Sequence, residues 1–220
     1  MVKAIIFDFD GTLADTLPAM LEALNLMLRD YSQPQIDKAG MMSFINGTIE
    51  DFVKAVLPAE KLRTDGDIKA ARGIYERYYS CTYTQTDRCY DGMYDLIGIL
   101  KPKYRLSILS NKQQEYIDKL NSLLFPEGLF ESVRGARSGC PGKPNPMSMM
   151  MLMVEMGIST DECVYIGDSD TDILTAKNAG VKMVCAGWGY RSPEYLHEHG
   201  ASIVANNPSE LLEILNKVLQ

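Results

Sequence analysis

The sequence contains no apolar run that approaches the roughly 20 residues of a membrane-spanning helix. Asp8 and Asp10 interrupt the apolar stretch near the N-terminus, so we do not expect a signal peptide there. Basic residues are in the minority, with 22 Lys and Arg against 29 Asp and Glu and a formal net charge of −7. This balance argues against a surface that binds nucleic acid or anionic membranes. We therefore expect neither kind of partner.

Cysteine and histidine are too scattered to indicate a zinc site. The five cysteines show no C-x-x-C spacing, and an odd number without that spacing suits a reducing compartment. The two histidines, His197 and His199, are two residues apart, so they do not share a helix face. We interpret both as surface residues and predict a cytoplasmic location.

Short apolar runs alternate with helical patterns over most of the chain. The runs cover residues 2–8, 104–110, 129–135, 163–168, 181–187 and 201–205. They are apolar on successive residues, which is typical of strands covered on both faces. Helical patterns begin near residues 112, 146, 171, 193 and 208. Strands that alternate with helices predict a Rossmann-like α/β core with a parallel sheet.

One region interrupts this alternation. From about residue 15 to residue 85 the pattern is helical and shows no convincing strand; Leu17, Leu24 and Leu28 fall on one stripe. We therefore predict an all-helical cap domain at residues 15–85, inserted into a core formed by residues 1–14 and 86–220.

Polar side chains stand where the expected strands end. They are Asp8, Asp10 and Thr12 after the first strand, Ser110 and Asn111 at the second, Lys143 in the loop before the fourth, and Asp168 and Asp172 after the fourth. Ligands of open α/β sheets bind beyond the carboxyl ends of the strands. We therefore expect these side chains to meet in one crevice.

Several carboxylates in one crevice need a counter-charge. Two like charges about 4 Å apart repel by about 4 kcal/mol at an effective dielectric near 20. A divalent cation removes this conflict, and the ligands on offer are all oxygen: Asp8, Asp168 and a backbone carbonyl. Such a set suits Mg²⁺, whereas zinc prefers Cys or His. The sequence therefore predicts Mg²⁺ as the cofactor.

Carboxylates, Mg²⁺, a lysine and a small hydroxyl together predict a phosphate ester as the substrate. Lys143 and Mg²⁺ would neutralise the phosphoryl oxygens, and the Ser110 hydroxyl and the Asn111 backbone N–H would donate to them. Asp8 would attack phosphorus and form an aspartyl-phosphate. Asp10 would protonate the leaving alkoxide and then deprotonate the hydrolytic water. The reaction predicted is that of a phosphomonoesterase.

Taken together, the motifs resemble those of the haloacid dehalogenase-like superfamily of phosphatases. They are Asp8-x-Asp10-Gly-Thr, Ser110-Asn, Lys143 in GKPNP and GDSDTD at 167–172, in that order. Within the superfamily the chain is most similar to phosphoglycolate phosphatase-like proteins, a likeness strengthened by GWGYR at 187–191. The resemblance implies Mg²⁺ bound by Asp8, the Asp10 carbonyl and Asp168, with Asp172 nearby. It also implies a C1-type helical cap that closes over the substrate.

Specificity is expected to come from the helical insertion, because the core reads only the phosphoryl group. Asn46, Gly47 and Thr48 form a break between expected cap helices, and we predict that they touch the leaving group. Thr12 is a further predicted phosphate-binding residue. A compact substrate such as phosphoglycolate is expected. A short sugar phosphate, a nucleoside monophosphate and pyrophosphate stay open, as does the choice between monomer and homodimer.

Several alternative functions are weighed against this hypothesis. Asp10 disfavours the dehalogenases and phosphonatases of the superfamily, which lack an acid at that position. Mutases of the superfamily carry a basic residue in the cap segment that corresponds to residues 45–52, and this chain has no Lys or Arg there, so a sugar-phosphate mutase is disfavoured. A pyrophosphatase stays open, and a phospho-accepting regulatory domain is disfavoured because such domains have no cap and carry their nucleophile after a later strand.

Overall fold

The computed structural model describes residues 1–43, 45, 48–86 and 88–218 of the 220-residue chain. These residues form two compact units, which we call the sheet unit (Met1–Asp15 and Cys89–Gln220) and the helical unit (Thr16–Arg88). The sequence placed the corresponding boundaries after residue 14 and before residue 86. The helical unit is thus inserted between the first strand of the sheet unit and the remainder.

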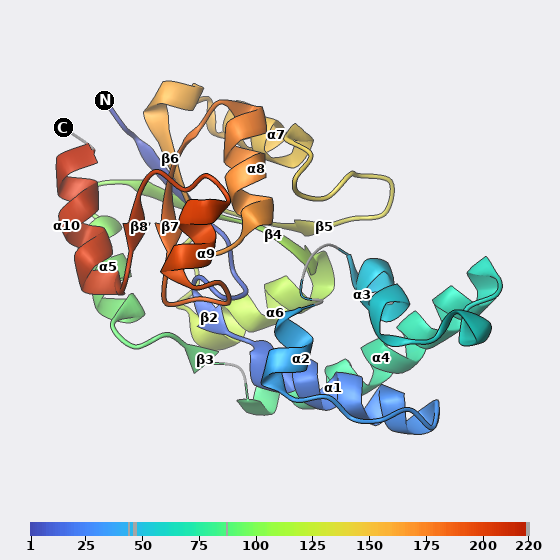
Figure 1. Cartoon of the computed structure of the whole chain (residues 1–220). Helices are drawn as coiled ribbons and strands as arrows, with labels where there is room; N and C mark the ends of the chain where they lie inside the picture. Colours follow the sequence, from blue (N-terminus) through green and yellow to red (C-terminus); the bar gives the residue numbers. More distant parts are fainter. Residues whose placement is uncertain (44, 46–47, 87, 219–220) are drawn as a thin grey trace. The chain divides into compact units, whose positions relative to one another are not determined.

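Six parallel strands form the sheet (Figure 1). They are β1 (Ala4–Phe7), β4 (Arg105–Gln113), β5 (Ser132–Ala136), β6 (Cys163–Gly167), β7 (Lys182–Ala186) and β8 (Val204–Ala205). Their spatial order is β5-β4-β1-β6-β7-β8, which is the Rossmann order 3-2-1-4-5-6 in terms of the six strands. Two short strands, β2 (Ala14–Asp15) and β3 (Arg88–Cys89), pair separately with each other. The predicted parallel α/β fold with inserted helices is confirmed.

The central strands are buried on both faces, as their continuous apolar runs predict. All four residues of β1 and all five of β6 are buried. Phe7 at the end of β1 lies opposite Ile108 of β4 and Ile166 of β6. This register brings the ends of β1 and β6 to the level of Ile108, so the residues after these two strands and the last part of β4 share one edge of the sheet.

Helices cover the sheet on both sides. They are α5 (Met93–Leu100), α6 (Gln114–Leu124), α7 (Met147–Met156), α8 (Asp170–Ala179), α9 (Pro193–Glu198) and α10 (Pro208–Val218), with a 3₁₀ turn at Thr160–Glu162. Helix α7 packs against α8, and α5 against α10 (Figure 1). Sequence patterns did not predict α5. Helix α6 begins at Gln114 and not near residue 112, because β4 continues as an irregular strand to Gln113.

The helical unit is built from α1 (Leu17–Asp30), α2 (Lys38–Met42), α3 (Ile49–Val56) and α4 (Asp65–Thr86), with a 3₁₀ turn at Ala59–Lys61. Helix α4 packs against both α1 and α3. Tyr75, Tyr79 and Tyr83 lie four residues apart on α4 and form a row of ring contacts, which Phe52 of α3 extends. This aromatic row gives the unit a core of its own.

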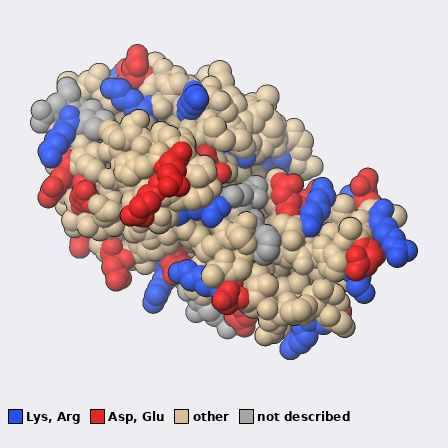
Figure 2. Space-filling view, in the orientation of Figure 1, with Lys and Arg blue, Asp and Glu red and all other residues tan. Residues whose placement is uncertain are grey.

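Charged side chains of both signs are interspersed on the face of the molecule drawn in Figure 2. Among the described residues, no helix has the length and apolar character needed to cross a lipid bilayer.

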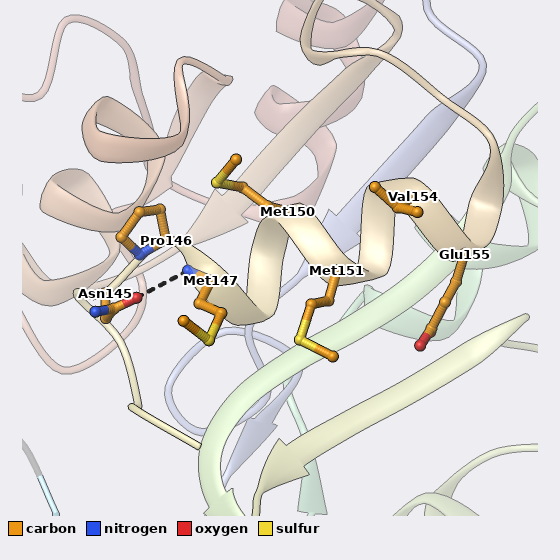
Figure 3. A pocket seen from close by; sticks show the side chains of 7 residues that line it. All are labelled: Asn145, Pro146, Met147, Met150, Met151, Val154 and Glu155. Atoms are coloured by element: carbon orange, nitrogen blue, oxygen red, sulfur yellow. Dashed lines mark hydrogen bonds between the residues drawn. The ribbon is translucent and has the colours of Figure 1, made fainter. Parts of the chain in front are cut away.

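Helix α7 has one buried and one exposed methionine face. Met149, Met153 and Met156 are buried in a cluster with Ile6 and Tyr165 of the sheet. The opposite face lines a shallow apolar pocket (Figure 3), formed by Asn145, Pro146, Met147, Met150, Met151, Val154 and Glu155. The two faces meet at neighbouring residues, since Met149 is fully buried and Met150 is 52% exposed.

These neighbours provide a matched test of the core. We expect Met149→Ala to lower the free energy of unfolding by about 2–5 kcal/mol, because it leaves a cavity under the sheet. Met150→Ala should change it by about 0.5 kcal/mol or less. Urea unfolding of both variants measures the difference, and equal losses would contradict the assigned orientation of α7.

Candidate active site

The candidate site lies at the point where the order of the sheet reverses. From β1 the chain proceeds to β4 and β5 on one side of β1, and then crosses to β6, β7 and β8 on the other. Such switch points open a crevice at the carboxyl ends of the two strands that border them. Asp8 directly follows β1 and Asp168 directly follows β6, and the Asp8 N–H donates to the Ile166 carbonyl at 2.8 Å.

A buried ammonium group joins two of the predicted carboxylates. Lys143 Nζ lies 2.8 Å from Asp8 Oδ1 and 2.7 Å from Asp172 Oδ1. It also lies 3.0 Å from the Tyr165 hydroxyl, which in turn donates to Asp172 Oδ1 at 2.6 Å. All four side chains are buried, so these charge-assisted contacts are only weakly screened by water.

Asp172 also caps the start of a helix. Ser169 is the N-cap of α8, and its backbone N–H and hydroxyl donate to Asp172 Oδ2 at 3.1 and 2.6 Å in a capping box. With Lys143 and Tyr165 on Oδ1, both oxygens of Asp172 have hydrogen-bond donors. Asp172 therefore orients Lys143 and fixes the start of α8.

The third carboxylate, that of Asp168, receives one hydrogen bond on each oxygen. Thr12 Oγ1 donates to Oδ1 at 3.0 Å, and the Tyr190 backbone N–H donates to Oδ2 at 2.7 Å. Asp8, Asp168 and Asp172 each place a carboxylate oxygen within 4.8 Å of the others. The structure thus brings together Asp8, Lys143, Asp168 and Asp172, as the strand-end hypothesis requires.

The buried carboxylates of this cluster outnumber the positive charge beside them, and burial shifts their pKa values. Burial raises the pKa of Asp8 to about 7 although the Lys143 charge acts to lower it, and Asp172 raises it further. The pKa of Asp168 rises well above its usual range, through burial first and then the charges of Asp172 and Asp8. Burial alone would raise the pKa of Asp172, but the charge and hydrogen bond of Lys143 lower it overall. Burial likewise acts to lower the pKa of Lys143, and the two carboxylates raise it overall.

The described residues fit a hard divalent cation. Asp8, Asp168 and Asp172 offer oxygen ligands alone, which suits Mg²⁺ and not zinc. Asp172 has two donors on each oxygen, whereas Asp168 has one on each, so Asp8 and Asp168 keep more lone pairs with which to hold the ion. A bound cation would also relieve the repulsion that raises their pKa values.

Lys112 is a charged residue of the site that sequence reasoning missed. Its Nζ lies 2.7 Å from Asp10 Oδ1, and the two side chains are only 7% and 19% exposed. Lys112 directly follows Ser110 and Asn111 in the sequence, so its position at a strand end was an available signal. The expected helix start near residue 112 obscured that signal. The ion pair holds the Asp10 side chain at the same end of the sheet as Asp8.

Ser110 and Asn111 lie within β4 and not after it. The Ser110 hydroxyl accepts a hydrogen bond from the Lys112 N–H at 3.1 Å. The Asn111 side chain brackets the backbone of Lys143, because its Nδ2 donates to the Lys143 carbonyl at 3.0 Å and its Oδ1 accepts from the Lys143 N–H at 2.7 Å. Asn111 thus positions the lysine loop, and the phosphate contacts of Ser110 and Asn111 stay predictions.

The remaining predicted residues are placed as follows. Asn46 and Gly47 lie outside the described residues. Thr48 is the N-cap of α3, where it forms a capping box with Asp51. The Thr12 side chain is buried and its hydroxyl donates a hydrogen bond to Asp168. Contacts of Thr12 and Thr48 with a substrate stay predictions.

Tyr165 and the loop at residues 187–191 make contacts in the candidate site that the sequence analysis did not predict. A tyrosine in a fully buried strand needs a hydrogen-bond partner for its hydroxyl, and that requirement was the available signal for Tyr165. The loop was noted only as a likeness to relatives. Its backbone contact with Asp168 depends on tertiary packing, which no local pattern reveals.

The fold and these strand-end residues define the class of protein. A model of haloacid dehalogenase-like hydrolases matches residues 5–186, so the chain belongs to this hydrolase family. The resemblance seen in the four motifs is therefore confirmed.

Individual relatives are similar over nearly the whole chain. A phosphoglycolate phosphatase of Colwellia psychrerythraea is 26% identical, over 98% of this chain and 97% of its own. An N-acetylmuramic acid 6-phosphate phosphatase of Pseudomonas aeruginosa is also 26% identical, over 99% and 96%. The crystal structure of a provisionally named phosphoglycolate phosphatase from Lactobacillus delbrueckii has a TM-score of 0.88 at 29% identity, covering 97% of this chain and 98% of that one.

Removing the buried ammonium tests the charge balance of the site. We expect Lys143→Met to lower the free energy of unfolding by about 3–5 kcal/mol in metal-free buffer, because buried carboxylates lose their counter-charge. Lys119→Met is the matched control; its lysine is 52% exposed and pairs with Glu115 on α6, so a loss of about 0.5 kcal/mol is expected. Urea unfolding at neutral pH checks both, and a Lys143→Met loss as small as that of the control would contradict this assignment.

Proposed function

We propose that this chain is a Mg²⁺-dependent phosphomonoesterase that hydrolyses a small phosphorylated metabolite through an aspartyl-phosphate on Asp8. The observation that carries this proposal is the buried Lys143 between Asp8 and Asp172, with Asp168 beside them at the switch point of the sheet. A positively charged lysine, a nucleophilic carboxylate and an oxygen-ligand metal site are the groups that phosphoryl transfer requires.

The side chains have distinct tasks in the reaction. A carboxylate oxygen of Asp8 attacks phosphorus; the new O–P bond forms as the bond to the ester oxygen breaks. Asp10 gives a proton to the departing alkoxide and then takes one from the water that attacks the aspartyl-phosphate. That second attack releases inorganic phosphate and restores Asp8. Lys143 stabilises negative charge on the phosphoryl oxygens throughout.

The other residues prepare these groups. Bound by Asp8, Asp168 and the Asp10 carbonyl, Mg²⁺ would supply Lewis-acid charge to the phosphoryl group. Lys112 orients the Asp10 carboxylate through their ion pair. Ser110 and the Asn111 N–H donate to the phosphoryl oxygens, and the helical unit acts as the cap that selects the leaving group, with Thr48 as a candidate contact.

For the substrate, we propose a compact phosphate monoester, with 2-phosphoglycolate as the first compound to test. Several relatives bear the name phosphoglycolate phosphatase, which supports this choice. An equally similar relative is named for N-acetylmuramic acid 6-phosphate, so the panel must extend to sugar phosphates. A sugar-phosphate mutase, a pyrophosphatase and a phospho-accepting domain are the alternatives; multiple-turnover release of phosphate from a monoester separates the proposed activity from all three.

The nucleophile is tested by a phosphate-release screen against a panel of metabolites. The wild-type protein with Mg²⁺ should release phosphate over many turnovers from at least one compact monoester. Asp8→Asn should abolish the release while keeping the thermal unfolding cooperative, because an amide cannot form the aspartyl-phosphate. Asp161→Asn changes an exposed acid and serves as the control with full activity. Activity retained by Asp8→Asn would remove Asp8 as the nucleophile.

The acid/base role of Asp10 is tested by varying the leaving group. Asp10→Asn should slow the hydrolysis of an alkyl phosphate by about 10²–10⁴-fold, because a poor leaving group needs the proton. The loss should be much smaller for 4-nitrophenyl phosphate, whose leaving group departs as a stable anion. Steady-state rates on both esters give the comparison, and equal losses would argue against Asp10 as the acid.

A further inference from the structure

The loop after β7 makes contacts that the proposed reaction does not use. Its residues 187–191 read GWGYR, and the loop belongs to the sheet unit. The Tyr190 N–H donates to Asp168 Oδ2 at 2.7 Å, and the Trp188 indole N–H donates to the Thr12 carbonyl at 3.1 Å. Since Thr12 Oγ1 donates to Asp168 Oδ1 at 3.0 Å, the contacts close a ring between the loop, the first motif and Asp168.

Glycine at position 189 allows the loop to lie directly against the site. A Cβ there would lie 2.3 Å from the Gly11 carbonyl oxygen and 2.4 Å from Asp168 Cβ, which are impossible contacts. Gly11 has the same constraint from the other side, because its own Cβ would lie 2.2 Å from Asp168 Oδ2 and its φ is +80°. Two glycines therefore enclose the Asp168 carboxylate, and any side chain at either position would displace it.

We propose that Trp188, Gly189 and Tyr190 form a clasp that positions the Asp168 carboxylate for the divalent cation, and that Trp188 reports whether the site is occupied. The inference rests on the cation site of the proposed function. A carboxylate has about four lone-pair sites, and the two hydrogen bonds engage one on each oxygen, which leaves others for a metal ion. Partners that orient a ligand in this way typically contribute 10–100-fold to metal affinity. Trp188 is the single tryptophan of the sequence and is joined to the site by its own hydrogen bond.

The direct test is calorimetric titration of the full-length protein with Mg²⁺ alone. Gly189→Ala should weaken Mg²⁺ binding by about 10–100-fold, because the added methyl group displaces Asp168 or the Gly11 carbonyl. Gly98→Ala is the matched control: Gly98 lies in α5, a Cβ there would meet nothing within 4 Å, and Mg²⁺ binding should be unchanged. A folded Gly189→Ala variant with wild-type Mg²⁺ affinity would overturn the clasp.

A second variant keeps the test decisive if Gly189→Ala does not fold. Trp188→Phe retains an aromatic ring but removes the N–H that reaches Thr12, so Mg²⁺ binding should weaken by about 2–10-fold, the range of one net hydrogen bond. An unchanged affinity of this variant for Mg²⁺ would overturn the proposed contribution of Trp188 to the clasp. In the wild-type protein, Trp188 fluorescence should change during the Mg²⁺ titration, and the midpoint of this change should equal the calorimetric midpoint. Constant emission at saturating Mg²⁺ would overturn its reporting role.

These measurements separate the clasp from the proposed function, because binding is read without turnover. If Gly189→Ala weakens Mg²⁺ binding but no phosphate ester is hydrolysed, the clasp stands and the phosphatase proposal fails. If the wild-type protein hydrolyses monoesters but both variants bind Mg²⁺ normally, the phosphatase proposal stands and the clasp fails.

Discussion

The structure of this site depends on one buried interaction, the ammonium group of Lys143 held between Asp8 and Asp172. Burial favours the neutral form of each carboxyl group, and their mutual repulsion adds to that effect. Lys143 offsets part of this cost, but three carboxylates share it among the described residues. The cluster is therefore prepared for a further positive charge, which is the property that a cation-dependent phosphatase needs.

Topology and local capping produce this cluster together. The reversal of strand order beside β1 places Asp8 and Asp168 at neighbouring strand ends. The capping box of α8 then fixes Asp172 where it can bind Lys143, so a residue that caps a helix also orients a functional group. Asn111 holds the lysine loop by two hydrogen bonds to the Lys143 backbone. Stability and function use the same contacts, and substitutions at these positions will affect both.

Much of the sheet could be predicted because its strands are continuous apolar runs and its helices begin at clear signals. The gathering of Asp8, Lys143, Asp168 and Asp172 followed from one rule about parallel strand ends. The pair of Lys112 with Asp10 was missed because we expected a helix to begin near residue 112, whereas β4 continues through Lys112 with an irregular register after Leu109. The contacts of Trp188 with Thr12 and of Gly189 with Gly11 depend on close backbone packing between segments more than 150 positions apart. Helix α5 was overlooked although its apolar residues are buried.

The measurement that tests this account most directly is an anomalous difference map from crystals of the protein grown with Mn²⁺. Mn²⁺ substitutes for Mg²⁺ because both take oxygen ligands in octahedral geometry. The account predicts a single strong peak within coordination distance of Asp8 and Asp168, beside Lys143 at the carboxyl ends of β1 and β6. A peak at another position, with none at these carboxylates, would contradict it.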